Sequence, residues 1–88
     1  MKGELEASID LGSRALKLAP GNFAVHLIVG RAYLSQERTT EAIAELETAA
    51  KLAPDSPDAH YSLSLAYAAA RRTKDAARER LEFERLKN

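Results

Sequence analysis

The two histidines, His26 and His60, are the side chains of this 88-residue sequence best suited to bind a metal ion or act as a general base. They lie 34 positions apart, and neither belongs to a His-x3-His or Glu-x-x-His pair on one helix face. Zinc ligands converge to about 2 Å from the metal, whereas equivalent side chains one structural repeat apart are too distant to share an ion. We therefore predict that each histidine packs between helices with a hydrogen-bond partner, and we predict no metal site.

Other catalytic chemistries lack their sequence patterns. No serine stands in a glycine elbow, so a hydrolase nucleophile is not indicated. The acidic side chains fall on polar helix faces, where we expect ordinary titration and no paired-carboxylate site. Cysteine is absent, which excludes disulfides and thiolate metal sites. The four glycines are too scattered for a phosphate-binding loop, at Gly3, Gly12, Gly21 and Gly30. Together these observations predict a protein without catalysis or cofactor.

The charge and hydropathy of the sequence argue against two classes of partner, nucleic acids and membranes. The formal net charge is zero, and the basic tail at residues 71–88 is interleaved with acids, so nucleic-acid binding is disfavoured. No run of 18 apolar residues occurs, and we expect no membrane insertion. Residues 1–4 do not resemble the start of a signal peptide. A cytoplasmic location is favoured, although a cysteine-free chain can fold in any compartment.

An internal repeat organises the chain. The segment Lys17-Leu18-Ala19-Pro20 recurs as Lys51-Leu52-Ala53-Pro54, at an offset of 34 residues. Repeats of 20–50 residues indicate stacked supersecondary units that cannot bury their apolar sides alone. Further identities fall on the same offset, and they include His26 with His60, Ala32 with Ala66, Tyr33 with Tyr67, Arg38 with Arg72 and Ala42 with Ala76.

Capping residues predict where the helices begin and end. Asn22 can cap a helix over residues 23–36, and Ser56 followed by Pro57 predicts a helix to about Arg71. Thr39 and Thr73 precede second helices that end near residues 52 and 86. A further helix fits residues 4–19, since Pro20 prevents continuation. The short loops between these helices indicate antiparallel neighbours.

The repeat resembles the tetratricopeptide family. One copy reads His26-x2-Val29-Gly30-x2-Tyr33, then Ala42-x3-Leu46, Ala49 and Pro54; the next reads His60-x2-Leu63-Ser64-x2-Tyr67, then Ala76. Ser64 replaces the family's glycine, and Arg80 stands where an aromatic residue is expected. The resemblance implies an all-α, right-handed α-α solenoid of antiparallel hairpins. Residues 1–88 would form a single domain of five helices: a half-repeat at 4–19 and repeats at 23–56 and 57–88.

The resemblance also implies a protein–protein interaction scaffold that binds a peptide or helical segment in a concave groove. In family register the groove is more apolar than charged, although the same side chains could be ordinary core. Among the positions that would hold the C-terminal carboxylate of a heat-shock chaperone, only Arg31 has suitable chemistry, so this ligand is disfavoured. The predicted groove residues are Leu27, Ile28, Arg31, Leu34, Tyr61, Ser62, Leu65 and Ala68.

Two alternatives stay open at this point. The first helix carries an apolar face with small residues one turn apart, which could pack on a missing helix or on a second copy as a homo-oligomer. That face comprises Leu5, Ser8, Ile9 and Gly12. Alternatively, the repeats could be an accessory segment of a larger multidomain protein.

Overall fold

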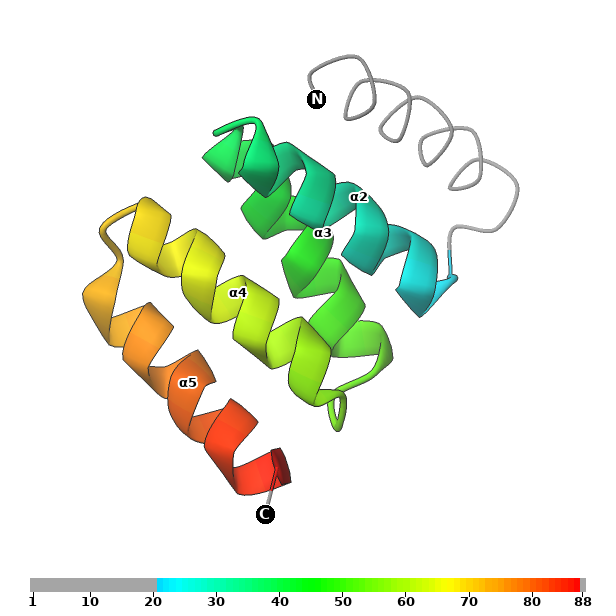
Figure 1. The fold of residues 1–88 in the computed structure, drawn as a ribbon. Helices are drawn as coiled ribbons and strands as arrows, with labels where there is room; N and C mark the ends of the chain where they lie inside the picture. Colours follow the sequence, from blue (N-terminus) through cyan, green and yellow to red (C-terminus); the bar gives the residue numbers. More distant parts are fainter. Residues whose placement is uncertain (1–20, 88) are drawn as a thin grey trace.

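The computed structural model describes residues 21–87, which form four α-helices (Figure 1). They are α2 (Phe23–Ser35), α3 (Thr39–Leu52), α4 (Pro57–Ala69) and α5 (Thr73–Lys87), and no strand occurs within this span. Helices α2 and α3 form one antiparallel hairpin, and α4 and α5 form the next. The helix predicted at residues 4–19 lies outside the described residues. The count of five helices and the right-handed sense of the solenoid stay predictions.

Side chains cap the first helix of each hairpin as predicted. The Asn22 side chain accepts a hydrogen bond from the Val25 N–H at 3.3 Å. The Ser56 hydroxyl accepts one from the Ala59 N–H at 3.4 Å. Each bond satisfies one of the N–H groups that the first turn of a helix leaves without a backbone partner.

The turn inside each hairpin has the same geometry. Glu37 and Arg71, which are 34 residues apart, adopt left-handed backbone conformations with φ of 61° and 62°. After α2, the Glu37 N–H bonds the Leu34 carbonyl and the next N–H bonds the Tyr33 carbonyl, which is the Schellman arrangement. A left-handed residue cannot continue a right-handed helix. For this reason the helix predicted to reach about Arg71 ends at Ala69 instead.

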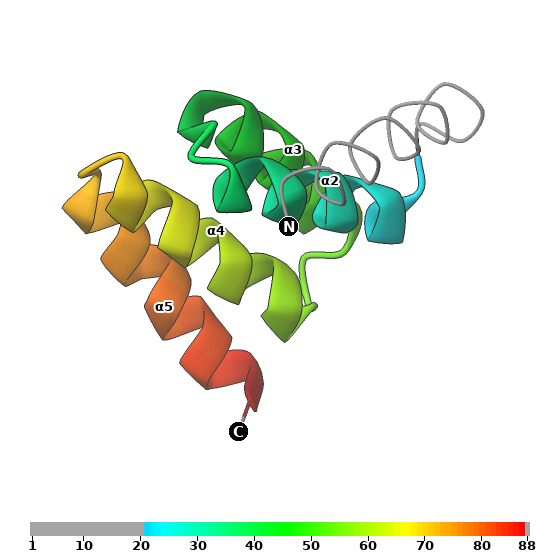
Figure 2. The same cartoon turned by 45° about the horizontal axis from the view of Figure 1, so that its top comes forward.

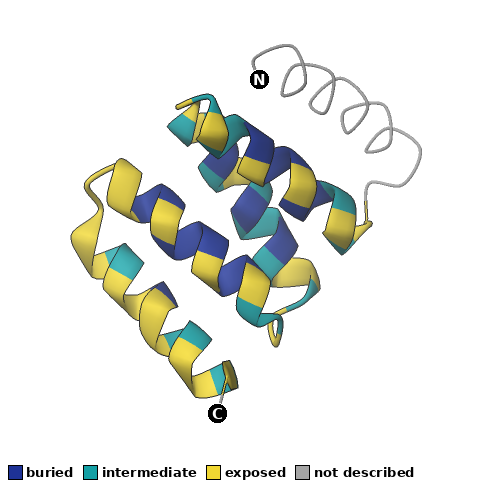
Figure 3. Cartoon of the chain, in the orientation of Figure 1, coloured by how far each residue is buried: buried dark blue, intermediate teal, exposed yellow. Residues whose placement is uncertain are grey.

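The core forms where α4 packs on the first hairpin. Helix α4 packs mainly on α3 and makes few contacts with α2, and the two hairpins stack side by side (Figures 1 and 2). One polar contact reinforces this junction: the Tyr67 hydroxyl of α4 donates to Glu47 Oε2 of α3 at 2.6 Å. Figure 3 shows buried residues concentrated where α2, α3 and α4 face one another. The buried cluster comprises Leu27, Ala42, Leu46, Ala49, Ala59, Leu63, Ala66 and Tyr67.

Gly30 allows α2 and α3 to approach each other closely. A Cβ atom built at Gly30 would lie 2.6 Å from Leu46 Cγ and 2.7 Å from Leu46 Cδ2. Leu46 is fully buried, so its side chain has no free space into which it could move. The missing side chain at Gly30 therefore sets the distance between these two helices.

We predict that Gly30→Ala destabilises the protein, although alanine favours a helix by up to about 1 kcal/mol over glycine. Overpacking a tight core costs about 1–3 kcal/mol, so the expected net loss in the free energy of unfolding is about 1–2 kcal/mol. Urea unfolding followed by circular dichroism measures it. The combined variant with Leu46→Ala should lose less than the sum of the two single losses, because the smaller side chain makes room for the new methyl group. Strict additivity of the two losses would contradict the close contact.

Candidate protein-binding face

Each histidine pairs with a glutamate across its own hairpin. His26 Nδ1 lies 2.8 Å from Glu45 Oε2, and His60 Nδ1 lies 2.7 Å from Glu79 Oε1. Both glutamates stand 19 residues after their histidines, so the pair recurs at the repeat period of 34. The prediction that the histidines pack between helices with hydrogen-bond partners is thereby confirmed. Sequence reasoning missed the glutamates, although their constant spacing from the histidines could have revealed them.

The His60 ring faces an acceptor on each side. Its Nε2 lies 2.7 Å from the backbone carbonyl of Pro54, and its Nδ1 lies against Glu79. A carbonyl and a carboxylate both accept hydrogen bonds, so the two contacts are satisfied together when both ring nitrogens of His60 carry a proton. The arrangement therefore favours the charged form of His60.

The pKa of His60 reflects this arrangement. Burial of the ring opposes protonation, but the hydrogen bonds to Glu79 and to the Pro54 carbonyl, together with the charges of Glu79 and Glu82, outweigh it. The net result is a pKa raised above the usual 6.5. Through these two contacts His60 of α4 links the α3–α4 loop to α5.

A tyrosine and an arginine also recur as a pair at the end of each first helix. The guanidinium carbon of Arg38 lies 4.7 Å from the centre of the Tyr33 ring, and that of Arg72 lies 4.4 Å from the centre of the Tyr67 ring. Burial and the hydrogen bond to Glu47 raise the pKa of Tyr67 to about 12, so its hydroxyl stays a donor at any physiological pH. These contacts hold the tyrosine and the arginine together at the turn of each hairpin.

The exposed apolar side chains of α2 and α4 gather on the side that these two helices share. Ile28 is 57% exposed and Leu65 is 43% exposed. Tyr61, one turn before Leu65 on α4, is 38% exposed, and its ring lies against Phe83 of α5 with the ring centres 5.1 Å apart. Figure 3 shows exposed residues along both helices on this side. We name this surface the α2–α4 face, and it comprises Ile28, Arg31, Tyr61, Leu65 and Ala68.

The remaining residues predicted for the groove differ in how much surface they offer. The side chains of Leu27 and Ser62 are buried, so a partner could contact little of either. Leu34 is half-buried and packs against the core cluster. These positions match the alternative that part of the predicted groove is ordinary core. The predicted self-association residues Leu5, Ser8, Ile9 and Gly12 lie outside the described residues.

The described part of the chain contains neither a cluster of metal-binding side chains nor a helix that could span a membrane. Between residues 21 and 87, no three His, Asp or Glu side chains cluster closely enough to hold a metal ion. Across the same residues, no helix combines the length and the apolar character that crossing a membrane requires.

Residues 30–70 match a family model described as "TPR repeat". This match confirms the tetratricopeptide resemblance of the sequence. The match begins at Gly30 in α2 and ends just after α4, so it covers the junction at which the hairpins stack. No curated protein matches the sequence.

Solved structures share the same arrangement of helices. MamA of strain AMB-1 superposes with a TM-score of 0.89 at 22% identity, over 97% of this chain and 50% of the MamA chain. MamA of strain MSR-1 gives a TM-score of 0.88 at 21% identity, over 96% of this chain and 48% of that one. A point mutant of MamA gives 0.75 at 20% identity, over 94% and 72%. The chain thus spans about half the length of the first two, and the likeness establishes the fold. Tetratricopeptide repeats in this fold suggest a protein-interaction module.

We predict that the stability of this domain falls as the pH rises above about 6.5, because His60 binds its proton more tightly in the folded state than in the unfolded state. The contribution of His60 is complete below the unfolded pKa and disappears as the pH passes through the raised folded pKa. Urea unfolding at about pH 6 and about pH 9 measures it. The His60→Gln variant should show a smaller difference between the two pH values, and an unchanged difference would contradict the assignment.

Proposed function

We propose that the protein binds a peptide or helical segment of a protein partner on its α2–α4 face and performs no catalysis. The observation that carries this proposal is the exposure of large apolar side chains from two successive repeats on one side of the molecule. Exposed apolar side chains scattered singly need no explanation, whereas a contiguous group indicates an interaction surface.

The position of these side chains supports the proposal. Ile28 and Arg31 lie one helical turn apart on α2, and Tyr61, Leu65 and Ala68 follow the same spacing on α4. Residues three or four apart on a helix point in one direction, so each helix contributes a stripe. A bound segment lying across the two stripes would bury apolar surface that the domain itself leaves in water.

The composition of the face indicates the chemistry of the segment. Isoleucine, leucine and tyrosine side chains favour an apolar partner surface. Arg31 is exposed and is the one charged member of the face, so an acidic group at the edge of the bound segment would find a counter-charge there. We propose a segment with several apolar side chains and a single carboxylate. The right-handed curvature expected for such an array would place the face on its concave side.

The test compares two leucines that are equally open to solvent. Leu65 on the α2–α4 face and Leu52 at the end of α3 are both 43% exposed. Partners captured by the intact protein would first be identified by mass spectrometry and then purified for calorimetric titration. We predict that Ile28→Asp and Leu65→Asp each weaken binding about tenfold or more, as truncating a buried interface contact costs about 1–2 kcal/mol.

The matched control is Leu52→Asp, which should bind like the wild type. Circular dichroism should show the same helical content in all variants, because none of the three side chains is buried. Equal loss of binding in Leu52→Asp, or full binding by the Ile28 and Leu65 variants, would reject the α2–α4 face as the binding surface.

A further inference from the structure

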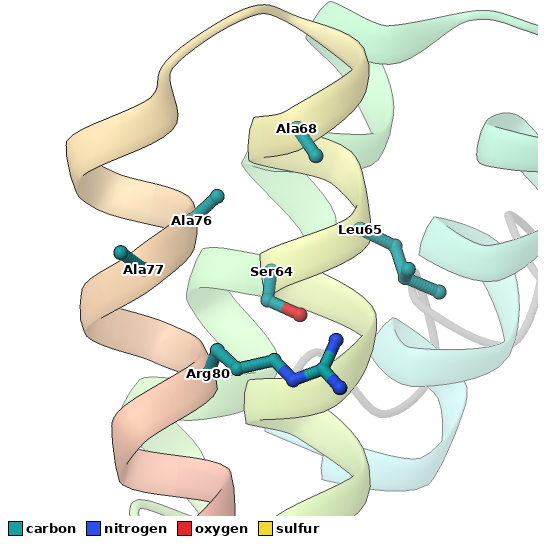
Figure 4. Close-up of a pocket in the computed structure, with 6 residues that line it drawn as sticks. All are labelled: Ser64, Leu65, Ala68, Ala76, Ala77 and Arg80. Carbon is teal, nitrogen blue, oxygen red and sulfur yellow. The ribbon is translucent and has the colours of Figure 1, made fainter.

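The second hairpin carries a hollow of about 230 Å³ between α4 and α5, which we name the α4–α5 hollow. Figure 4 shows the Arg80 side chain reaching from α5 toward α4, and Leu65 on the side of α4 away from α5. The Ser64 hydroxyl donates to the Tyr61 carbonyl of its own helix at 2.6 Å. The lining residues are Ser64, Leu65, Ala68, Ala76, Ala77 and Arg80.

The first hairpin shows how the equivalent surface is used. Each lining residue stands 34 positions after a residue of α2 or α3, and Ala76 and Arg80 correspond to Ala42 and Leu46. Ala42 and Leu46 have no exposed surface and belong to the cluster that α4 joins. Helix α4 thus occupies on the first hairpin the place that is open on the second.

The residues that α4 contributes to that junction describe a suitable occupant. Leu63 of α4 is buried in the shared cluster, with Ala59 and Ala66 one turn away on either side. A helix with one leucine-sized side chain between small residues therefore fits this kind of surface. Because stacked repeats reuse one interface geometry, the same shape of helix suits the α4–α5 hollow.

The second hairpin differs from the first at two positions of this surface, and both differences affect which helix could bind there. Arg80 takes the place of the buried Leu46, and its side chain is 61% exposed. Among residues 21–87 its ion-pair partner is Glu84, at 3.9 Å and also exposed. Leu81 takes the place of Glu47, the residue that accepts the Tyr67 hydroxyl from α4, and it is 70% exposed. The second hairpin therefore presents a cation and a leucine toward the position that a docked helix would occupy.

We propose that the α4–α5 hollow binds an amphipathic helix of a partner protein, which packs a leucine-sized side chain on Ala77 and Leu81 and pairs a carboxylate with Arg80. The binding mode is the one by which α4 docks on the first hairpin, with the carboxylate replacing an apolar contact. This surface shares Leu65 and Ala68 with the α2–α4 face. It differs from that face in using Ala77, Arg80 and Leu81 of α5 and no residue of α2.

The probe is a synthetic peptide with the sequence of residues 56–71, the segment that fills the equivalent surface, stapled on its outward side and carrying Ala66→Glu. A second peptide carries Ala66→Lys instead. We expect the intact protein to bind the glutamate peptide about tenfold more tightly than the lysine peptide, as measured by fluorescence anisotropy. Arg80→Glu should reverse this preference.

Controls separate the hollow from other surfaces. Lys74→Glu removes an exposed cation of α5 outside the hollow and should leave the preference for the glutamate peptide unchanged. Ile28→Asp should also leave peptide binding unchanged, so failure of the α2–α4 face and failure of the hollow are distinguishable.

Three results would overturn the proposal. The first is no binding of either peptide, and the second is a preference for the glutamate peptide that persists in Arg80→Glu. The third comes from sedimentation of the protein alone: self-association that Arg80→Glu abolishes would assign the hollow to a second copy of this chain and not to a partner helix.

Discussion

The junction between α3 and α4 is the contact on which the rest of the described structure depends. Leu46 has no exposed surface, and it meets α2 at Gly30 on one side and the α4 cluster on the other. A two-helix hairpin has too little apolar surface to offset the conformational entropy lost on folding. By stacking, the two hairpins bury one shared core, and the polar bond between Tyr67 and Glu47 fixes their register.

The two hairpins repeat most of their polar details but differ at one point. The histidine–glutamate pair, the tyrosine–arginine contact and the left-handed turn all recur 34 residues apart. In the second hairpin, Ser64 stands at the position of Gly30 and Arg80 at the position of Leu46. Here the helix pair tolerates a side chain in place of glycine, because Arg80 can turn toward solvent whereas Leu46 cannot. Helix α4 covers the surface around Ala42 and Leu46, whereas no described helix covers the equivalent surface of the second hairpin.

The sequence was informative about the helices because their signals are local. The caps at Asn22 and Ser56 and the period of 34 residues predicted all four described helices, with ends correct to within about two residues. The left-handed residues Glu37 and Arg71 were not predictable, because neither is a glycine or an asparagine.

The candidate site was less predictable because burial depends on tertiary packing. Leu27 and Ile28 are neighbours of similar hydrophobicity, yet Leu27 is buried in the core cluster and Ile28 is 57% exposed. Likewise the glutamates that pair with His26 and His60 lie on the opposite helix of each hairpin. The register between two helices, which no local pattern encodes, decides these partners.

Native-state hydrogen exchange on the Leu46→Ala variant tests most directly whether the two hairpins form one cooperative unit through their junction. If they do, amides of α4 and α5 lose protection together with those of α2 and α3, although the substituted residue belongs to α3. Loss of protection confined to α2 and α3, with α4 and α5 exchanging as in the wild type, would contradict the shared core.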